Sequence, residues 1–249
     1  MIGADRLTLR LGGRTVLDDI NFALECGRMT AIIGPNGAGK TSLIRALAGL
    51  LPGPVQLDGQ PLAALSLVER ARRIGYLPQD GEPAWNVTAR ELVALGRLPH
   101  RSRLAAPSAA DANAISAAFV ATDTSQFADR AINTLSGGER ARVKMARVLA
   151  GNPDWILADE PLANLDPPHQ RDLLALLRAA AASGKGIVAV LHQLDAAALA
   201  DDVLILKEGR IVAFGPARDV MTPSNLETAF EMAFDVIAHQ QRLAILPRA

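Results

Sequence analysis

Apolar and polar residues alternate near the start of the chain, in two short strings separated by Gly12 and Gly13. The strings are Leu7, Leu9 and Leu11, followed by Ile20, Phe22 and Leu24. A period of two is typical of strands with one buried face, and paired glycines favour a turn. The pattern predicts a hairpin over residues 4–25 that belongs to an antiparallel sheet at the edge of the fold.

Continuous apolar runs predict strands of a different kind, buried on both faces as in a parallel sheet. The runs are residues 29–33, 74–79, 155–160 and 186–191. Helical patterns follow at residues 41–49, 66–73 and 169–182, and again from about residue 225 onward. Residues 203–212 read as a closing hairpin, and the alternation of strands and helices predicts an α/β fold.

The sequence pattern changes between about Asp80 and Asn133, where strand signals are absent and helix start signals appear. Thr88 with Glu91 matches a capping box, and Ser108 can cap a second helix. These signals predict a separate helical lobe within the chain. We expect His100, in the turn between the two helices, to be a surface residue and not a ligand.

The stretch Gly34-Pro35-Asn36-Gly37-Ala38-Gly39-Lys40-Thr41 follows one predicted strand and opens a helix. Its glycines let successive backbone N–H groups point at phosphate oxygens, while Lys40 supplies a charge and the Thr41 hydroxyl can bind magnesium. Ser42 continues this candidate nucleotide-binding set. A chance glycine-rich turn with a solvated lysine is the alternative, which the strand before and the helix after it disfavour.

A second candidate anion site lies at Leu135-Ser136-Gly137-Gly138-Glu139. Ser136 occupies an N-cap position, Glu139 completes a capping box, and a helix follows. Two glycines in the first turn leave the free N–H groups unshielded, so that a phosphate can approach the positive end of the helix. An ordinary capped helix is the alternative, but capping alone does not require paired glycines.

Polar residues end three of the buried strands, at the edge where parallel sheets place their chemistry. Asp159 can hold magnesium through water, and Glu160 can orient and deprotonate an attacking water. His192 is a candidate phosphate sensor, and Gln79 can reach a metal or water. Alternatively, the two acids only begin a solvated loop.

Composition narrows the function classes. The 249 residues are 49% apolar, and 26 Lys and Arg balance 26 Asp and Glu, so no global basic field attracts nucleic acid. No apolar run approaches the ~18 residues that a membrane span needs, and no signal-peptide layout is visible. The lone Cys26 suits a reducing compartment and is expected to be a small buried apolar residue.

Taken in order, these motifs resemble the nucleotide-binding subunit of ATP-binding-cassette (ABC) transporters over nearly the whole chain. The resemblance implies ATP and Mg²⁺ as cofactors, with Walker A at 34–41, the Q-loop at Gln79, the signature motif at 135–139 and Walker B at 156–159. It further implies Glu160 as catalytic base, Asp166 in the D-loop, His192 as the switch histidine, and Thr41, Gln79 and Asp159 near the metal. One departure is Leu11, which stands where an aromatic residue usually stacks on adenine.

The same resemblance implies the organisation of the chain: one ABC ATPase domain over 1–249, with a RecA-like core at 1–80 and 151–249 and the helical signature lobe at 81–150. It also implies a homodimer in which each ATP on Lys40 is capped by Ser136, Gly137 and Gly138 of the other copy.

Further strings resemble the bacterial importers of iron-siderophores, haem and cobalamin. They are Tyr76-Leu77-Pro78-Gln79, residues 95–100 and residues 160–167. This implies a membrane permease as partner, indirectly a substrate-binding protein, no nucleic acid, and a peripheral position at the cytoplasmic face of the cell (inner) membrane. Trp85 and its neighbours between Gln79 and Leu98 are a candidate permease-docking surface.

Two other classes share part of the pattern. A soluble cassette ATPase acting on nucleic acid or the ribosome would normally carry two cassettes or long insertions, and the balanced charge argues against it. A phosphate-loop kinase or GTPase would share residues 34–41, but the guanine-reading Asn-Lys-x-Asp is absent. In those enzymes residues 135–139 would also have no role.

Overall fold

The computed structural model describes residues 1–79, 86–102, 106–239 and 242–248. Its centre is a six-stranded sheet with the order β10-β9-β3-β8-β7-β6. The strands are β3 (Met29–Ile33), β6 (Ile74–Leu77), β7 (Trp155–Asp159), β8 (Gly186–Val190), β9 (Asp202–Lys207) and β10 (Arg210–Pro216). All neighbours are parallel except β9 and β10. The continuous apolar runs therefore form the parallel strands as predicted.

A second, antiparallel sheet has the order β2-β1-β4-β5. It consists of β1 (Ile2–Leu11), β2 (Arg14–Leu24), β4 (Val55–Leu57) and β5 (Gln60–Pro61). The predicted edge hairpin is confirmed, since β1 pairs antiparallel with β2. Helix α1 (Lys40–Leu47) packs in one apolar core with residues of both sheets, so the helix that follows the phosphate loop is fixed on two sides.

The opposite face of the central sheet is covered by α6 (Pro167–Ala182) and the C-terminal helices. The remaining helices of this part are η1 (Leu62–Ala64), α2 (Leu67–Arg73), α7 (Leu194–Ala197), α8 (Ala217–Val220) and α9 (Pro223–Phe230). No helix in the described part of the chain combines the length and apolar character needed to cross a bilayer.

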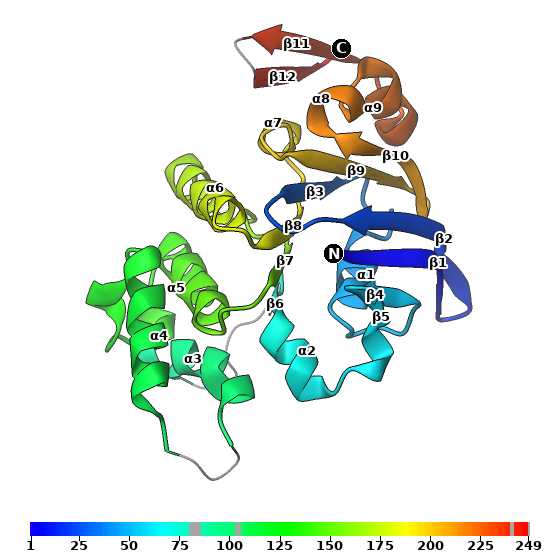
Figure 1. The fold of residues 1–249 in the computed structure, drawn as a ribbon. Coiled ribbons are helices and arrows are strands. Elements are labelled where there is room, and N and C mark those ends of the chain that lie inside the picture. Colours follow the sequence, from blue (N-terminus) through cyan, green and yellow to red (C-terminus); the bar gives the residue numbers. More distant parts are fainter. Residues whose placement is uncertain (80–85, 103–105, 240–241, 249) are drawn as a thin grey trace.

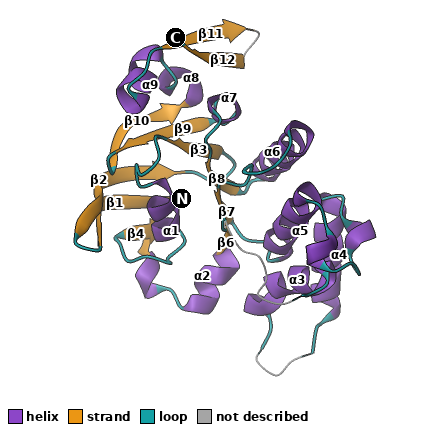
Figure 2. Cartoon of the chain, turned by 180° about the vertical axis from the view of Figure 1, so that it is seen from behind, coloured by secondary structure: helices purple, strands orange, loops and turns teal. Residues whose placement is uncertain are grey.

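Helices α3, α4 and α5 form a group to one side of the two sheets, with its own apolar core (Figure 1). Its elements are α3 (Ala89–Ala94), η2 (Leu95–His100), α4 (Ala109–Ala121), η3 (Ser125–Phe127), η4 (Ile132–Thr134) and α5 (Gly137–Ala150). Seen from behind, the same group stands apart from the strands (Figure 2). Met145 and Val148 of α5 pack into the core beneath the central sheet, which anchors the group.

Capping explains why these helices begin where they do. The boxes predicted at Thr88 and Glu91 and at Ser136 and Glu139 are both present, and Ser108 caps α4 with Asp111 as its partner. Each box satisfies backbone and side-chain groups at a helix start that would otherwise lack partners.

Two expectations were wrong. Residues after α9 form a hairpin of β11 (Phe234–His239) and β12 (Arg242–Pro247), not a continuing helical region. Cys26 is exposed, because it lies in the turn between β2 and β3 and not on a strand face. His100 is partly exposed, and its Nε2 lies 2.8 Å from the carbonyl oxygen of Gly151. Trp85 lies outside the described residues.

Candidate functional site

The phosphate loop connects β3 to α1, and two of its glycines are required by close contacts. A Cβ on Gly34 would lie 2.0 Å from the carbonyl oxygen of Leu206, and one on Gly39 would lie 2.8 Å from that of Val16. Both glycines have positive φ, 150° and 100° respectively, which disfavours other residues. The loop can therefore lie against β9 and β2 only with glycine at these positions.

Lys40 begins α1 and is 6% exposed. Its Nζ donates to the carbonyl oxygens of Gly34 at 2.8 Å and Pro35 at 2.9 Å. Burial lowers the pKa of Lys40, whereas the charges of Glu160 and Asp159 oppose that shift. The ammonium group is thus held inside the curl of the loop, where an anionic ligand would restore a favourable environment for its charge.

A pocket of about 230 Å³ lies beside the loop. Its lining residues are Val16, Asn36, Gly37, Gly39, Lys40, Thr41, Ser42 and Glu160. The structure therefore brings most of the predicted loop residues together with the predicted acid from β7. Val16 was missed by sequence reasoning, because a valine in an edge strand carries no chemical signal of its own.

Asp159 ends β7 and is fully buried. Its two carboxylate oxygens accept hydrogen bonds from the hydroxyls of Thr41 and Tyr76, each at 3.2 Å. Burial raises the pKa of Asp159, and these hydroxyls only partly oppose it. Tyr76 was not predicted as a site residue, although a tyrosine hydroxyl in a buried strand needs a polar partner.

Glu160 follows directly, with a φ of 50° that turns the chain away from the strand. One carboxylate oxygen lies 2.6 Å from Nε2 of His192, and the other accepts from Nε2 of Gln79 at 2.5 Å. Strands β6, β7 and β8 are neighbours, so the residues that follow them meet at one edge. The three predicted polar residues therefore form one cluster around the Glu160 carboxylate.

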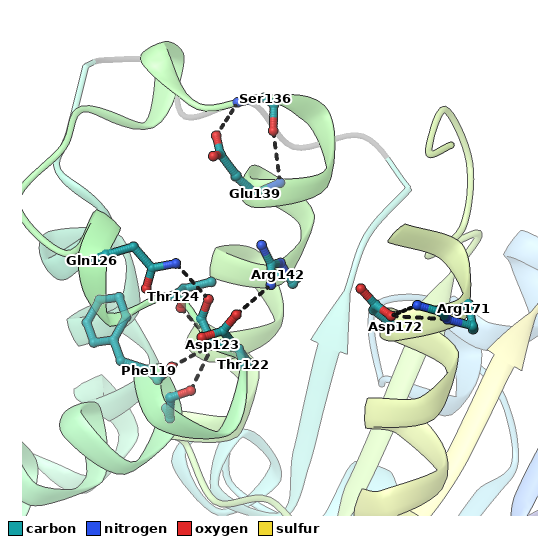
Figure 3. Close-up of polar contacts among 11 residues, drawn as sticks. Phe119, Thr122, Asp123, Thr124, Gln126, Ser136, Glu139, Arg142, Arg171 and Asp172 are labelled. Carbon is teal, nitrogen blue, oxygen red and sulfur yellow. Dashed lines mark hydrogen bonds and ion pairs between the residues drawn. The ribbon is translucent and has the colours of Figure 1, made fainter. Parts of the chain in front are cut away.

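At the start of α5, the amide of Ser136 donates to Glu139 at 2.8 Å and the amide of Glu139 donates to Ser136 Oγ at 3.3 Å (Figure 3). The two glycines between them have different surroundings. Gly137 is exposed, whereas a Cβ on Gly138 would lie 2.2 Å from the ring of His169 on α6. A larger residue at position 138 would therefore displace the His169 ring, whereas Gly137 leaves the helix start open.

The signature motif and the phosphate loop line different cavities. Gly137 lines a cleft of about 510 Å³ between α5 and the loop after β7, together with Gln79, Glu160 and Asn164. Asp166 caps α6 by accepting from the backbone and ring nitrogens of His169, and its side chain is 61% exposed. Among the described residues of one chain, Glu160 alone lines both cavities.

Leu11 lies at the tip of the β1–β2 hairpin, opposite Arg14, and is 40% exposed. Val16, on the following strand, lines the phosphate-loop pocket. In the ranges that the structure describes, no group of three or more His, Cys, Asp or Glu side chains is arranged to hold a metal by itself.

This fold and site define a class: a phosphate-loop nucleotide-binding protein with a helical lobe that carries a second glycine-rich helix start. A family model described as "ABC transporter" matches residues 17–163. The chain belongs to the ABC transporter family, as a subunit that binds and hydrolyses ATP.

Curated proteins with similar sequences are also ATP-binding subunits of ABC importers. The chain is 46% identical over 230 residues to the hemin import ATP-binding protein HmuV of Nocardia farcinica, covering 91% of this chain and 79% of the relative. It is 38% identical to the cobalamin import ATP-binding protein BtuD of Halobacterium salinarum, covering 90% of this chain and 57% of that protein.

Solved structures share the fold. A chain from the structure of a metal-chelate type ABC transporter in an inward-facing conformation matches with a TM-score of 0.85 at 24% identity, covering 100% of this chain and 97% of that one. A dimeric ATP-binding cassette bound to ADP and Pi matches with a TM-score of 0.74 at 27% identity, covering 88% of this chain and 99% of that one.

Proposed function

We propose that this chain powers the import of a haem-, cobalamin- or iron-siderophore-type cargo, as one of two identical ATPase subunits beneath a membrane permease. The observation that carries the catalytic part is the Glu160 carboxylate, held between Gln79 and His192 at the edge of the phosphate-loop pocket. The names of the hemin and cobalamin import relatives support the cargo class.

In this proposal Glu160 orients and deprotonates the water that attacks the γ-phosphate. His192 and Gln79 contact the two carboxylate oxygens, and these contacts fix the direction of the base. The loop amides from Gly34 to Thr41 surround the phosphates, and Lys40 contributes a positive charge at the outer phosphates.

The residues present fit Mg²⁺. The Thr41 hydroxyl and the Asp159 carboxylate lie 3.2 Å apart, and Asp159 is a buried acid without a cationic hydrogen-bond partner among the described residues. Oxygen ligands and a substrate phosphate are the environment that Mg²⁺ prefers. Bound there, Mg²⁺ would neutralise phosphate charge during transfer. Thr41 would be its direct ligand, and Asp159 and Gln79 would hold its water shell.

The separation of the two cavities supports a composite site. We assign residues 1–80 and 151–249 to a catalytic core and residues 81–150 to the signature lobe. ATP on Lys40 of one copy would be capped by the open helix start at Ser136 and Gly137 of the other, with the Asp166 loops near the shared interface. Family members that crystallise as dimers support this arrangement.

Mixing two individually inactive variants tests the composite site. Lys40→Ala removes the loop charge and Ser136→Arg blocks the helix start, so a mixed dimer holds one site with both lesions and one with neither. We expect partial recovery of ATPase activity on mixing. If subunit exchange is demonstrated and no activity returns, the second test is whether the Glu160→Gln variant forms a dimer when ATP is added, measured by light scattering. A variant that stays monomeric at saturating ATP would contradict the composite site.

In this proposal the permease contacts a surface shared by the lobe and the neighbouring helix α2 of the core. Leu95 and Leu98 on η2 are 47% and 55% exposed, and Leu67 and Val68 on α2, which contacts η2, are 76% and 51% exposed. Exposed apolar residues from adjacent elements are typical of protein contacts. Import ATPases of this family work with a permease, which would place this chain peripherally at the cytoplasmic face of the membrane.

Glu160→Gln tests the catalytic proposal. The amide keeps the shape of the side chain but lacks the basic oxygen, so hydrolysis should fall about 10²–10⁴-fold while ATP binding persists. Glu227→Gln, the same change at an exposed position on α9, is the matched control and should hydrolyse ATP at the parent rate. Unchanged turnover in Glu160→Gln would remove Glu160 from the mechanism.

A further inference from the structure

Two glutamines outside the predicted motifs connect two loops. One loop follows β7 and begins with the catalytic acid Glu160, and the other follows β8 and contains His192. Gln170 lies in the first turn of α6, and Gln193 directly follows His192. Nε2 of Gln193 donates to Oε1 of Gln170 at 3.0 Å. Nε2 of Gln170 donates to the carbonyl oxygens of Leu165 at 2.8 Å and Leu162 at 3.3 Å.

The backbone carbonyls of Leu162 and Leu165 determine which atoms donate and which accept in this series of hydrogen bonds. Backbone carbonyls only accept, so Gln170 must turn its NH₂ group toward Leu162 and Leu165. Its oxygen then faces Gln193, which must present its own NH₂ group. Neither glutamine can rotate its amide by 180° without losing hydrogen bonds, and this gives the connection a defined geometry.

These contacts close a ring with the catalytic acid. Glu160 is the first residue of the loop of residues 160–166, and Leu165 lies near the end of this loop. The Glu160 carboxylate contacts His192. Gln193, the next residue, reaches the other end of the same loop through Gln170. Glu160 and Asn164 in this loop both have left-handed backbone conformations, with φ of 50° and 58°. The loop therefore needs outside contacts to hold its shape.

We propose that Gln170 is a positioning residue for ATP hydrolysis, which couples the His192 loop to the loop of residues 160–166 through Gln193. This rests on the proposed roles of Glu160 and His192. A displacement of His192 pulls on Gln193 and Gln170, and Gln170 then moves the carbonyls of Leu162 and Leu165. The base and the segment leading to Asp166 thus respond together to the state of the nucleotide.

Neither glutamine lines the phosphate-loop pocket, whose lining comes from other residues. Loss of the ring should therefore lower kcat and leave the KM for ATP nearly unchanged. Gln170→Met and Gln193→Met remove the amides at similar side-chain length. Gln170→Glu keeps an acceptor for Gln193 but replaces the donor to the two carbonyls with a charged oxygen that repels them. Gln126→Met is the matched control, an exposed glutamine in the helical lobe that donates to one carbonyl.

The experiment measures kcat, KM and Tm for the full chain and these variants. Each change at Gln170 or Gln193 should lower kcat roughly tenfold, the magnitude expected for one lost positioning contact. The Gln170→Met, Gln193→Met double variant should be no slower than the slower single variant, because both break one ring. Gln126→Met should retain the parent kcat.

Three outcomes would overturn the inference: parent-like kcat in both single variants, a double variant whose loss is the product of the single losses, or a rise in KM that accounts for the whole effect. Glu160→Gln in the same assay separates this inference from the proposed function. If Glu160→Gln is slow while the glutamine variants are normal, only the coupling fails. If Glu160→Gln is normal, the catalytic proposal fails and the coupling with it.

Discussion

Asp111 in the helical lobe and Asp159 in the core are both buried aspartates, 4% and 0% exposed, with opposite electrostatic surroundings. The pKa of Asp111 is lowered to about 2, because it accepts hydrogen bonds from the backbone of Ser108, pairs with Arg97 and accepts from the Ser108 hydroxyl. Its Oδ1 lies 2.9 Å from Nε of Arg97, which also donates to Ala150 at 2.9 Å. These contacts with Ser108 and Arg97 favour the charged form of the acid and outweigh the opposing effect of burial.

Among the described residues, the hydrogen-bond partners of the Asp159 carboxylate are the hydroxyls of Thr41 and Tyr76, and burial raises its pKa. Burial likewise lowers the pKa of Lys40 across the loop. The lobe thus satisfies its buried charge within the chain, whereas the core leaves two charges incompletely compensated. A buried acid of the first kind maintains structure, and one of the second kind indicates a ligand from outside the chain.

The largest expected difference between the two aspartates is in catalysis. Asp159→Asn should lower Mg²⁺-dependent ATP hydrolysis at least about 10²-fold, because the amide is a poor anchor for a cation that neutralises phosphate charge. Asp111→Asn, assayed well below its melting temperature, should hydrolyse ATP near the parent rate. A Mg²⁺ titration of both variants is the measurement, and equal losses in the two would show that the contrast has no catalytic meaning.

For thermal stability we expect the opposite ranking: the substitution at Asp111 should have the larger destabilising effect. Asp111→Asn leaves the buried Arg97 guanidinium without its anion, so Tm should fall by several degrees. The pKa of Asp111 is lowered on folding, so its contribution is present above the ordinary pKa of an aspartate and is lost as pH falls toward 2. The Tm difference from the parent should shrink over that range. A difference constant from pH 7 to pH 2 would contradict the role of this charge.

The sequence predicted this contrast only in part. The capping of α4 by Ser108 and the placement of Asp159 at a strand end both followed from local patterns. The pairing of Asp111 with Arg97 did not, because it joins η2 to α4, and no local pattern specifies how these two helices are placed relative to each other. Likewise, Tyr76 meets Asp159 only because β6 and β7 are neighbours.

The same limit applies to the fold. Buried strands and helix starts were predicted well, since they depend on hydrophobic period and capping residues. The β11–β12 hairpin was not predicted although Phe234, Val236, Leu243 and Ile245 alternate, because no strong turn signal separates this segment from the helical pattern before it. The contacts among Gln79, Glu160 and His192 could not be predicted without the order of the strands in the sheet, and the spacing of residues in the sequence does not give that order.

The smallest expected effect concerns the stability of the nucleotide-free protein. Because Asp159 carries an incompletely compensated buried charge, Asp159→Asn should raise the free energy of unfolding by about 1 kcal/mol at pH 7, opposite in sign to Asp111→Asn. The Asn amide can still bond both hydroxyls, since a hydroxyl donates or accepts.

The dependence on pH distinguishes charge from packing. An acid whose pKa is raised on folding binds its proton more tightly in the folded state, so the cost of burying Asp159 is present above its folded pKa and fades as pH falls. Below about pH 4, the ordinary value for aspartate, the cost is gone. The advantage of Asp159→Asn in urea unfolding without nucleotide or Mg²⁺ should therefore be greatest near pH 7 and vanish near pH 4. An advantage that persists at pH 4 would mean that packing, and not the buried charge, separates the two variants.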